Sequence, residues 1–209
     1  MNYNLLGRTL LFIALLIIET GCKKESKTQP DPLTSETVEI EGNEYPSLVI
    51  GDKIWTTKNY AGPGGINYDS IGTRPEYGKY YTFHEIEEIK LPKGWRLPRM
   101  QDFMSLAANE GITFSNNRAI NQEPIKRLAS TRNWRTIPGS NASGFDAQPA
   151  GYCFKQQPPL EGDIAEFWTV EGYTFSIQET AGGKTHRIVF YSNGSSPEYR
   201  FNLRFVRDR

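Results

Sequence analysis

Three short stretches decide the fold of this chain: Gly94-Trp95-Arg96-Leu97-Pro98, Gly144-Phe145-Asp146-Ala147-Gln148-Pro149-Ala150-Gly151 and Phe201-Asn202-Leu203-Arg204-Phe205-Val206-Arg207-Asp208. Each is too short to identify a structure by itself, but their order and spacing are informative as a set. The segments around them therefore determine the architecture to expect.

Residues 38–60 alternate apolar and polar side chains between turn signals. Gly42-Asn43 and Gly51-Asp52 are pairs that accept the positive φ angles of tight hairpins. This pattern predicts an N-terminal β-meander.

Helical patterns follow, and strand patterns close the chain. We expect short helices at 84–90, 98–109 and 124–130, with Phe103, Leu106 and Ala107 on the inward face of the second. Pro98 suits a first helical turn and Gly111 a helix end. Strands are expected at 164–170, 173–179, 184–191 and 199–206. Helices between an opening meander and closing antiparallel strands predict an α+β fold.

The three stretches, in this order, resemble the Fibrobacter succinogenes major paralogous domain. The resemblance spans about Tyr45 to Asp208 and also includes the opening segment 49–60 and the segment 76–83. It implies a C-type-lectin-like fold, related to formylglycine-generating enzymes, with antiparallel strands, two or three short helices and long loops. In that architecture the first and last strands pair, and the loops carry the variable chemistry. The family has no settled activity.

Composition excludes some partners. The 209 residues contain 24 Lys and Arg and 24 Asp and Glu, so no net charge attracts nucleic acid or an acidic bilayer. With 37% hydrophobic and 12% aromatic residues, the chain has enough apolar surface to form a core. Nucleic-acid binding is therefore not expected.

The N-terminal residues predict export and a lipid anchor. Arg8 precedes the apolar run 9–18, which is too short to span a bilayer, so residues 1–21 are interpreted as a lipoprotein signal peptide. The following Gly21-Cys22 resembles a bacterial lipobox, although Glu19 departs from its aliphatic pattern. Acylation at Cys22 would attach the chain to a membrane. Because Lys23 follows, we expect an outer-membrane lipoprotein of a Gram-negative bacterium, facing either the periplasm or the exterior.

Residues 22–36 are predicted to be a flexible tether, and residues 37–209 the folded domain. The tether contains two prolines, no aromatic residue and a single leucine, too little apolar surface to fold. The domain contains no catalytic motif that we recognise. Cys153 has no partner for a disulfide if Cys22 is acylated, and we interpret it as a buried small apolar residue. With His84 and His186 as the only histidines, neither a metal nor another cofactor is expected.

Recognition through loops is the remaining possibility. The loops expected beside the last strands are 133–141, 155–162 and 192–200. Aromatic, arginine and amide side chains in them could contact a ligand with large area at modest entropic cost. The candidate ligand-binding residues are Trp134, Arg135, Tyr191, Asn193, Tyr199 and Arg200. For Trp134, Tyr191 and Tyr199 the alternative is packing in the core.

The function expected from the sequence is that of a non-enzymatic, lipid-anchored envelope protein that binds a glycan, peptide or protein through its loop face. The alternative is a structural or adhesion subunit of a surface assembly. A degenerate enzyme is the third hypothesis. A concave aromatic site would favour binding, whereas a flat apolar patch would favour assembly.

Overall fold

The computed structural model describes residues 35–69, 72–155, 157, 159, 161–180, 182 and 184–209. The expected signal peptide, Cys22 and nearly all of the expected tether lie outside these residues. The first strand begins at Ser35, two residues before the expected start of the domain. No helix among the described residues is long and apolar enough to cross a membrane.

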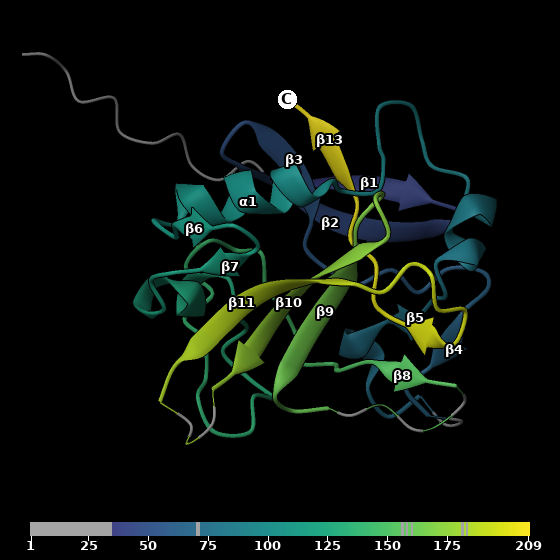
Figure 1. Cartoon of the computed structure of the whole chain (residues 1–209). Coiled ribbons are helices and arrows are strands. Elements are labelled where there is room, and N and C mark those ends of the chain that lie inside the picture. Colours follow the sequence, from purple (N-terminus) through teal and green to yellow (C-terminus); the bar gives the residue numbers. More distant parts are fainter. Residues whose placement is uncertain are drawn as a thin grey trace, which may run out of the picture. The chain divides into compact units, whose positions relative to one another are not determined.

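The opening meander is confirmed, and the end of the chain completes its sheet (Figure 1). The sheet has the order β1-β2-β3-β13, with all neighbours antiparallel. Gly42 and Gly51, at φ 78° and 65°, form the two hairpin turns. The last strand therefore joins the opening sheet beside β3. The bounds are Ser35–Ile40 for β1, Asn43–Ile50 for β2, Lys53–Thr56 for β3 and Val206–Asp208 for β13.

A second sheet has the order β6-β7-β11-β10-β9. Its three long strands run side by side in Figure 1. Two further pairs, β4 with β5 and β8 with β12, make small two-stranded sheets. The bounds are Ile66–Asn67 (β4), Lys79–Tyr80 (β5), Phe114–Ser115 (β6), Arg118–Ala119 (β7), Cys153–Phe154 (β8), Ile164–Trp168 (β9), Tyr173–Glu179 (β10), His186–Ser192 (β11) and Tyr199–Arg200 (β12).

The expected α+β class, with two or three helices in a C-type-lectin-like fold, is wrong: the described residues form an all-β fold with four sheets. The only α-helix among them is α1, Met100–Asn109. The other helical segments are the 3-10 helices η1, η2 and η3, with bounds Pro75–Tyr77, His84–Glu88 and Glu123–Arg127.

Two of the expected helices are short 3-10 helices, η2 because it buries little apolar surface and η3 because a competing backbone contact follows it. η2 contains no buried residue, and its single apolar side chain, Ile86, packs only partly buried against the core, which is too little apolar contact to stabilise a longer helix. η3 ends because the backbone of Ala129 pairs with that of Ala147 in a parallel bridge. A residue that pairs sideways with another segment cannot also continue a helix.

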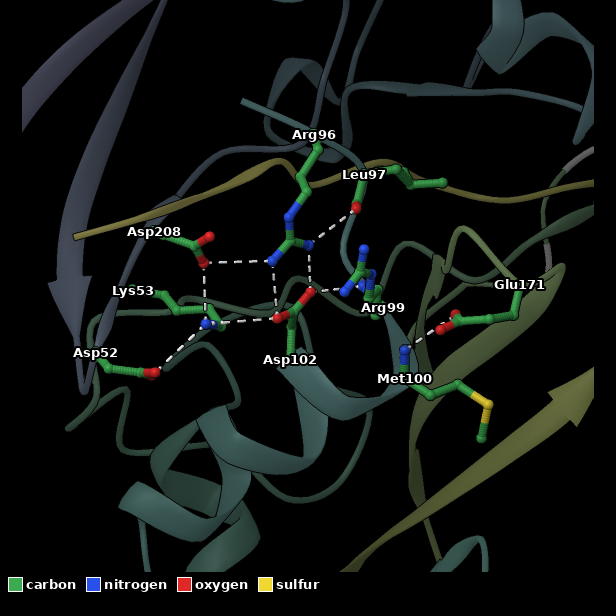
Figure 2. Close-up of polar contacts among 9 residues, drawn as sticks. All are labelled: Asp52, Lys53, Arg96, Leu97, Arg99, Met100, Asp102, Glu171 and Asp208. Atoms are coloured by element: carbon green, nitrogen blue, oxygen red, sulfur yellow. Dashed lines mark hydrogen bonds and ion pairs between the residues drawn. The ribbon is translucent and has the colours of Figure 1, made fainter. Parts of the chain in front are cut away.

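The start of α1 is held by the first of the three stretches (Figure 2). The Arg96 guanidinium donates two hydrogen bonds to the Asp102 carboxylate, one of 3.0 Å, and the Arg99 N–H donates a third at 2.7 Å. Pro98 lies before the helix, because its carbonyl accepts a hydrogen bond from the Val170 N–H at 2.9 Å. Phe103, Leu106 and Ala107 are buried, as the helical pattern predicts.

The core under α1 is aromatic. The ring of Phe103 stacks on that of Phe175 in β10, with centroids 4.4 Å apart. Trp55 of β3 contacts both Phe103 and Phe145, with centroids 5.1 and 5.6 Å away. Helix, meander and five-stranded sheet therefore share one apolar cluster.

The expected continuous strand 199–206 is interrupted. Only its ends belong to named strands, while Phe201 and Asn202 form isolated bridges to Tyr81 and Phe167. Two buried polar side chains take irregular backbone as partners: Asn202 donates to the carbonyl of Tyr77 at 2.9 Å, and Arg204 to several carbonyls. Regular strand pairing does not contain such buried side-chain hydrogen bonds, and here they occur where the expected strand is interrupted.

Candidate functional site

A hollow of about 360 Å³ lies where the long strands of the second sheet meet β12. Strands β9, β10 and β11 contribute part of the lining. The segments around Tyr152 and β12, which bridge to β9 at Gly151 and Asn202, contribute the rest. The lining residues are Tyr152, Ile164, Glu166, Gln178, Arg187, Tyr191, Asn193, Tyr199 and Phe201.

One wall of the hollow is aromatic. The rings of Tyr199 and Phe201 stack at 5.7 Å with an interplanar angle of 18°, and Tyr152 lies 5.9 and 5.6 Å from them. Phe201 is buried, whereas Tyr152 and Tyr199 are half-buried. Half-buried rings of this kind offer flat apolar faces to a ligand.

A second wall of the hollow is polar, and its side chains orient one another. Arg187 Nε donates to Gln178 Oε1 at 2.9 Å, and Gln178 Nε2 donates to Tyr191 Oη at 3.3 Å. Asn193 Nδ2 donates to Thr174 Oγ1 at 2.9 Å. These bonds hold amide, phenol and guanidinium groups in defined directions, as specific recognition requires.

Glu166 lies at the floor of the hollow. It is buried on β9 and accepts a hydrogen bond of 2.5 Å from Thr174 Oγ1. Burial raises the pKa of this carboxyl to about 7, against the smaller lowering effect of the hydrogen bond from Thr174.

Three of the six candidate ligand-binding residues come together here: Tyr191, Asn193 and Tyr199 all line the hollow. Arg200 follows Tyr199 in the chain, but its guanidinium is paired with Glu85 at 2.5 Å, outside the hollow's lining.

The other two candidates lie elsewhere. Trp134 is buried, with its ring 4.5 Å from that of His186, so it belongs to the core. Arg135 is exposed and donates to Asp163 Oδ2 at 3.2 Å and to the Glu161 carbonyl at 2.9 Å. These two hydrogen bonds connect the loop that contains Arg135 to the segment 161–163.

Sequence reasoning missed several lining residues, above all Glu166, Tyr152 and Gln178. The available signal for Glu166 was weak: it is a single acid within the otherwise apolar strand pattern 164–168. Such a residue is expected on a solvent-facing side, but Glu166 is 3% exposed in the folded chain.

A larger hollow of about 560 Å³ borders the second and third stretches, near Asn133, Asp146 and Arg204. Its aromatic lining is limited to the buried Tyr45. Arg204 is fully buried there, and the acceptors of its hydrogen bonds belong to the protein itself. This hollow therefore offers a ligand fewer aromatic faces than the hollow lined by Tyr199 and Glu166.

Cys153 is fully buried, as expected of a small apolar residue, and burial raises the pKa of its thiol to about 12. A thiol in this state is a poor nucleophile. Within the described part of the chain, no group of three or more His, Cys, Asp or Glu side chains is placed to hold a metal ion.

Comparison with known proteins agrees with the three stretches. Residues 48–207 match the model of the Fibrobacter succinogenes major domain, so the chain belongs to the Fibrobacter succinogenes major domain family. The family resemblance predicted from the sequence is thus confirmed. No curated protein and no solved structure matches the chain.

Proposed function

We propose that this protein is a non-enzymatic binding protein of the cell envelope, and that it binds a glycan in the hollow between β9–β11 and β12. The observation that carries the proposal is that an aromatic wall and an oriented polar wall line the same hollow. Sugar rings present apolar C–H faces and hydroxyl groups together, and these two walls are complementary to both.

The small number of exposed large apolar side chains in the described part of the chain favours a binding protein over a structural subunit. Among the described residues, the large apolar side chains that are strongly exposed are Ile120 and Val170, at 65% and 51%. Single exposed apolar residues are normal on a soluble surface, whereas an assembly interface is expected to present a contiguous patch.

Anchoring through Cys22 at the outer membrane is part of the proposal and depends on the sequence pattern at residues 1–23. Cells expressing the protein are labelled with a palmitate analogue, and the wild type is compared with Cys22→Ala. Label that depends on Cys22 supports the anchor. Undiminished label in the variant contradicts it.

The test of glycan binding uses the full chain carrying Cys22→Ser, screened on a glycan array and measured by calorimetry with each ligand found. Tyr199→Ala removes a ring of the aromatic wall, and its control is Tyr68→Ala, a half-buried tyrosine outside the hollow. We expect Tyr199→Ala to weaken binding at least about tenfold, because ring contacts contribute about 1 kcal/mol or more.

A second matched pair tests the polar wall. Asn193→Ala removes an amide of the hollow, while Asn133→Ala removes one outside it. Equal affinities for the two variants, or the absence of any glycan ligand on the array, would contradict the proposal.

A further inference from the structure

Glu166 is the most unusual group of the hollow, because it is an acid that the protein leaves almost without partners. Its residue is 3% exposed, yet it contributes to the lining. Within the described part of the chain, its carboxyl accepts one side-chain hydrogen bond, from Thr174, and has no cationic nitrogen within 4.0 Å. A buried acid is ordinarily paired or hydrogen-bonded at both oxygens.

The hydroxyl of Thr174 has a defined direction. It accepts from Asn193 Nδ2 at 2.9 Å and donates its single proton to Glu166 Oε1 at 2.5 Å. One carboxyl oxygen is therefore occupied by a neutral donor. The second oxygen has no hydrogen-bond partner among the described residues, and its carboxyl borders the hollow.

The charged and titratable groups that line the hollow with Glu166 come from each surrounding element. Arg187 and Tyr191 belong to β11, Tyr199 to β12, and Tyr152 to the segment before β8. Arg187 is exposed, and its Nε is bound to Gln178, so its charge lies at the solvent side and is screened. Burial raises the pKa of Tyr152 above its ordinary value, so this ring is neutral near pH 7.

The aromatic wall suits a cation. The rings of Tyr152, Tyr199 and Phe201 line the hollow together with the carboxyl. An ammonium group is attracted by the faces of aromatic rings, most strongly where water is excluded. It is also the group that a buried, unpaired carboxylate lacks.

We infer that the hollow selects a sugar that carries a free, protonated amino group, and that the ammonium pairs with the Glu166 carboxylate against the aromatic wall. This inference depends on the proposed glycan-binding function. It names the ligand class as an amino sugar with an unsubstituted amine, as distinct from neutral or N-acetylated sugars.

Binding then releases a proton. In the free protein, burial keeps the Glu166 carboxyl largely protonated below pH 7. A bound ammonium group favours the ionised carboxylate, so the carboxyl proton passes to the buffer while the ligand keeps its own. The released proton is a measurable signature of pairing at Glu166.

The experiment compares two β-1,4-linked tetrasaccharides of the same length, one of glucosamine and one of N-acetylglucosamine. Each is titrated calorimetrically into the full chain carrying Cys22→Ser, at about pH 6 and in buffers of different ionisation enthalpy. We expect the glucosamine oligomer to bind at least about tenfold more tightly, with release of a fraction of a proton for each molecule bound.

Glu166→Gln is the decisive variant, because it keeps the shape of the side chain and removes its charge. It is expected to lose both the preference for the amine and the proton release, while a thermal melt reports whether it is folded. Glu161→Gln, outside the hollow's lining, is the control and is expected to behave like the parent. If the parent binds both oligomers equally, or if folded Glu166→Gln keeps the preference, the inference is wrong.

The two proposals fail in different ways. If other glycans on the array bind and neither oligomer does, the amine inference is overturned and glycan binding stands. If no glycan binds at all, the proposed function is overturned, and the inference falls with it.

Discussion

The guanidinium of Arg204 donates a hydrogen bond of 3.0 Å to the backbone carbonyl of Phe145 and lies 5.0 Å from the centre of its ring. This contact joins the second of the three stretches to the third. The side chain is fully buried, and its other acceptors, in Thr56, Asn59 and Asp146, are also neutral. Burial accordingly lowers the pKa of the guanidinium to about 9.

Arg204→Lys is expected to destabilise the protein by about 3 kcal/mol. The planar fork of arginine serves four acceptors at once. The ammonium of lysine carries three donors on one nitrogen, so it leaves at least one acceptor unpaired and cannot match the geometry of the others, at about 1–3 kcal/mol for each bond lost. Urea unfolding followed by tryptophan fluorescence measures the difference. The control is Arg135→Lys on the surface, expected to change stability by less than about 0.5 kcal/mol. An unchanged midpoint for Arg204→Lys would contradict this role.

Acid unfolding is predicted to depend on Asp102. Burial alone would raise the pKa of its carboxyl, but hydrogen bonds from Arg96 and the Arg99 N–H, together with nearby Lys53, outweigh burial and hold the pKa below its usual value (Figure 2). Because the folded pKa is the lower one, this stabilisation is present above the unfolded pKa of about 3.9 and is lost as the pH falls through the folded value.

Asp102→Asn should therefore lower the urea midpoint near neutral pH and flatten its fall between about pH 4 and the acid limit. Asp52→Asn is the control, because Asp52 is largely exposed, at 74% of its side chain. Parallel acid profiles for the wild type and Asp102→Asn would show that the prediction is wrong.

For Glu166 we expect the opposite pH dependence, with a free energy of unfolding that falls as the pH rises. Its folded pKa of about 7 lies above the unfolded value of about 4.3, so its contribution is fully present below the unfolded pKa and is lost as the pH rises through the folded value. The loss amounts to roughly 4 kcal/mol, since each pKa unit corresponds to about 1.4 kcal/mol.

The measurement is the free energy of unfolding of wild type and Glu166→Gln from about pH 5 to about pH 8 without ligand. The difference between the two curves is expected to change across this range in favour of the variant. A constant difference would mean that the carboxyl is already ionised at the acid end of the range.

Cys153 is predicted to be unreactive in the folded protein, because its thiol is fully buried and has a pKa of about 12. A chain with Cys22→Ser, treated with a thiol reagent near pH 8, should react only after urea unfolding. Rapid modification of the native protein would show that the segment around β8 opens on the time scale of the reaction.

Sequence patterns were sufficient where the responsible contacts are local. The alternation and glycine turns of residues 38–56 predict β1 to β3, and the spacing of Phe103, Leu106 and Ala107 predicts the buried face of α1. The helices expected at 84–90 and 124–130 are short 3-10 helices instead. The first buries no residue, and the second meets the Ala129 bridge to Ala147, a contact with a distant segment that a local pattern does not reveal.

For the candidate site, the sequence indicated the region but not the constellation. Tyr191, Asn193 and Tyr199 belong to adjoining segments, and aromatic and amide residues there are reasonable candidates. Trp134 and Arg135 are candidates on the same grounds, as an aromatic and an arginine residue in a loop. However, Trp134 packs in the core and Arg135 pairs with Asp163. Residue type alone does not distinguish an exposed ring from a buried one.

Sequence alone determined the family and the opening meander, because these follow from ordered motifs and from residues close together along the chain. Tertiary structure decided the all-β class and the hollow. Glu166, Tyr152 and Tyr199 come from separate segments and meet only when β12 packs beside the long strands. Burial, which sets both the protonation of Glu166 and the exposure of the rings, is a property of that packing and is absent from any single segment.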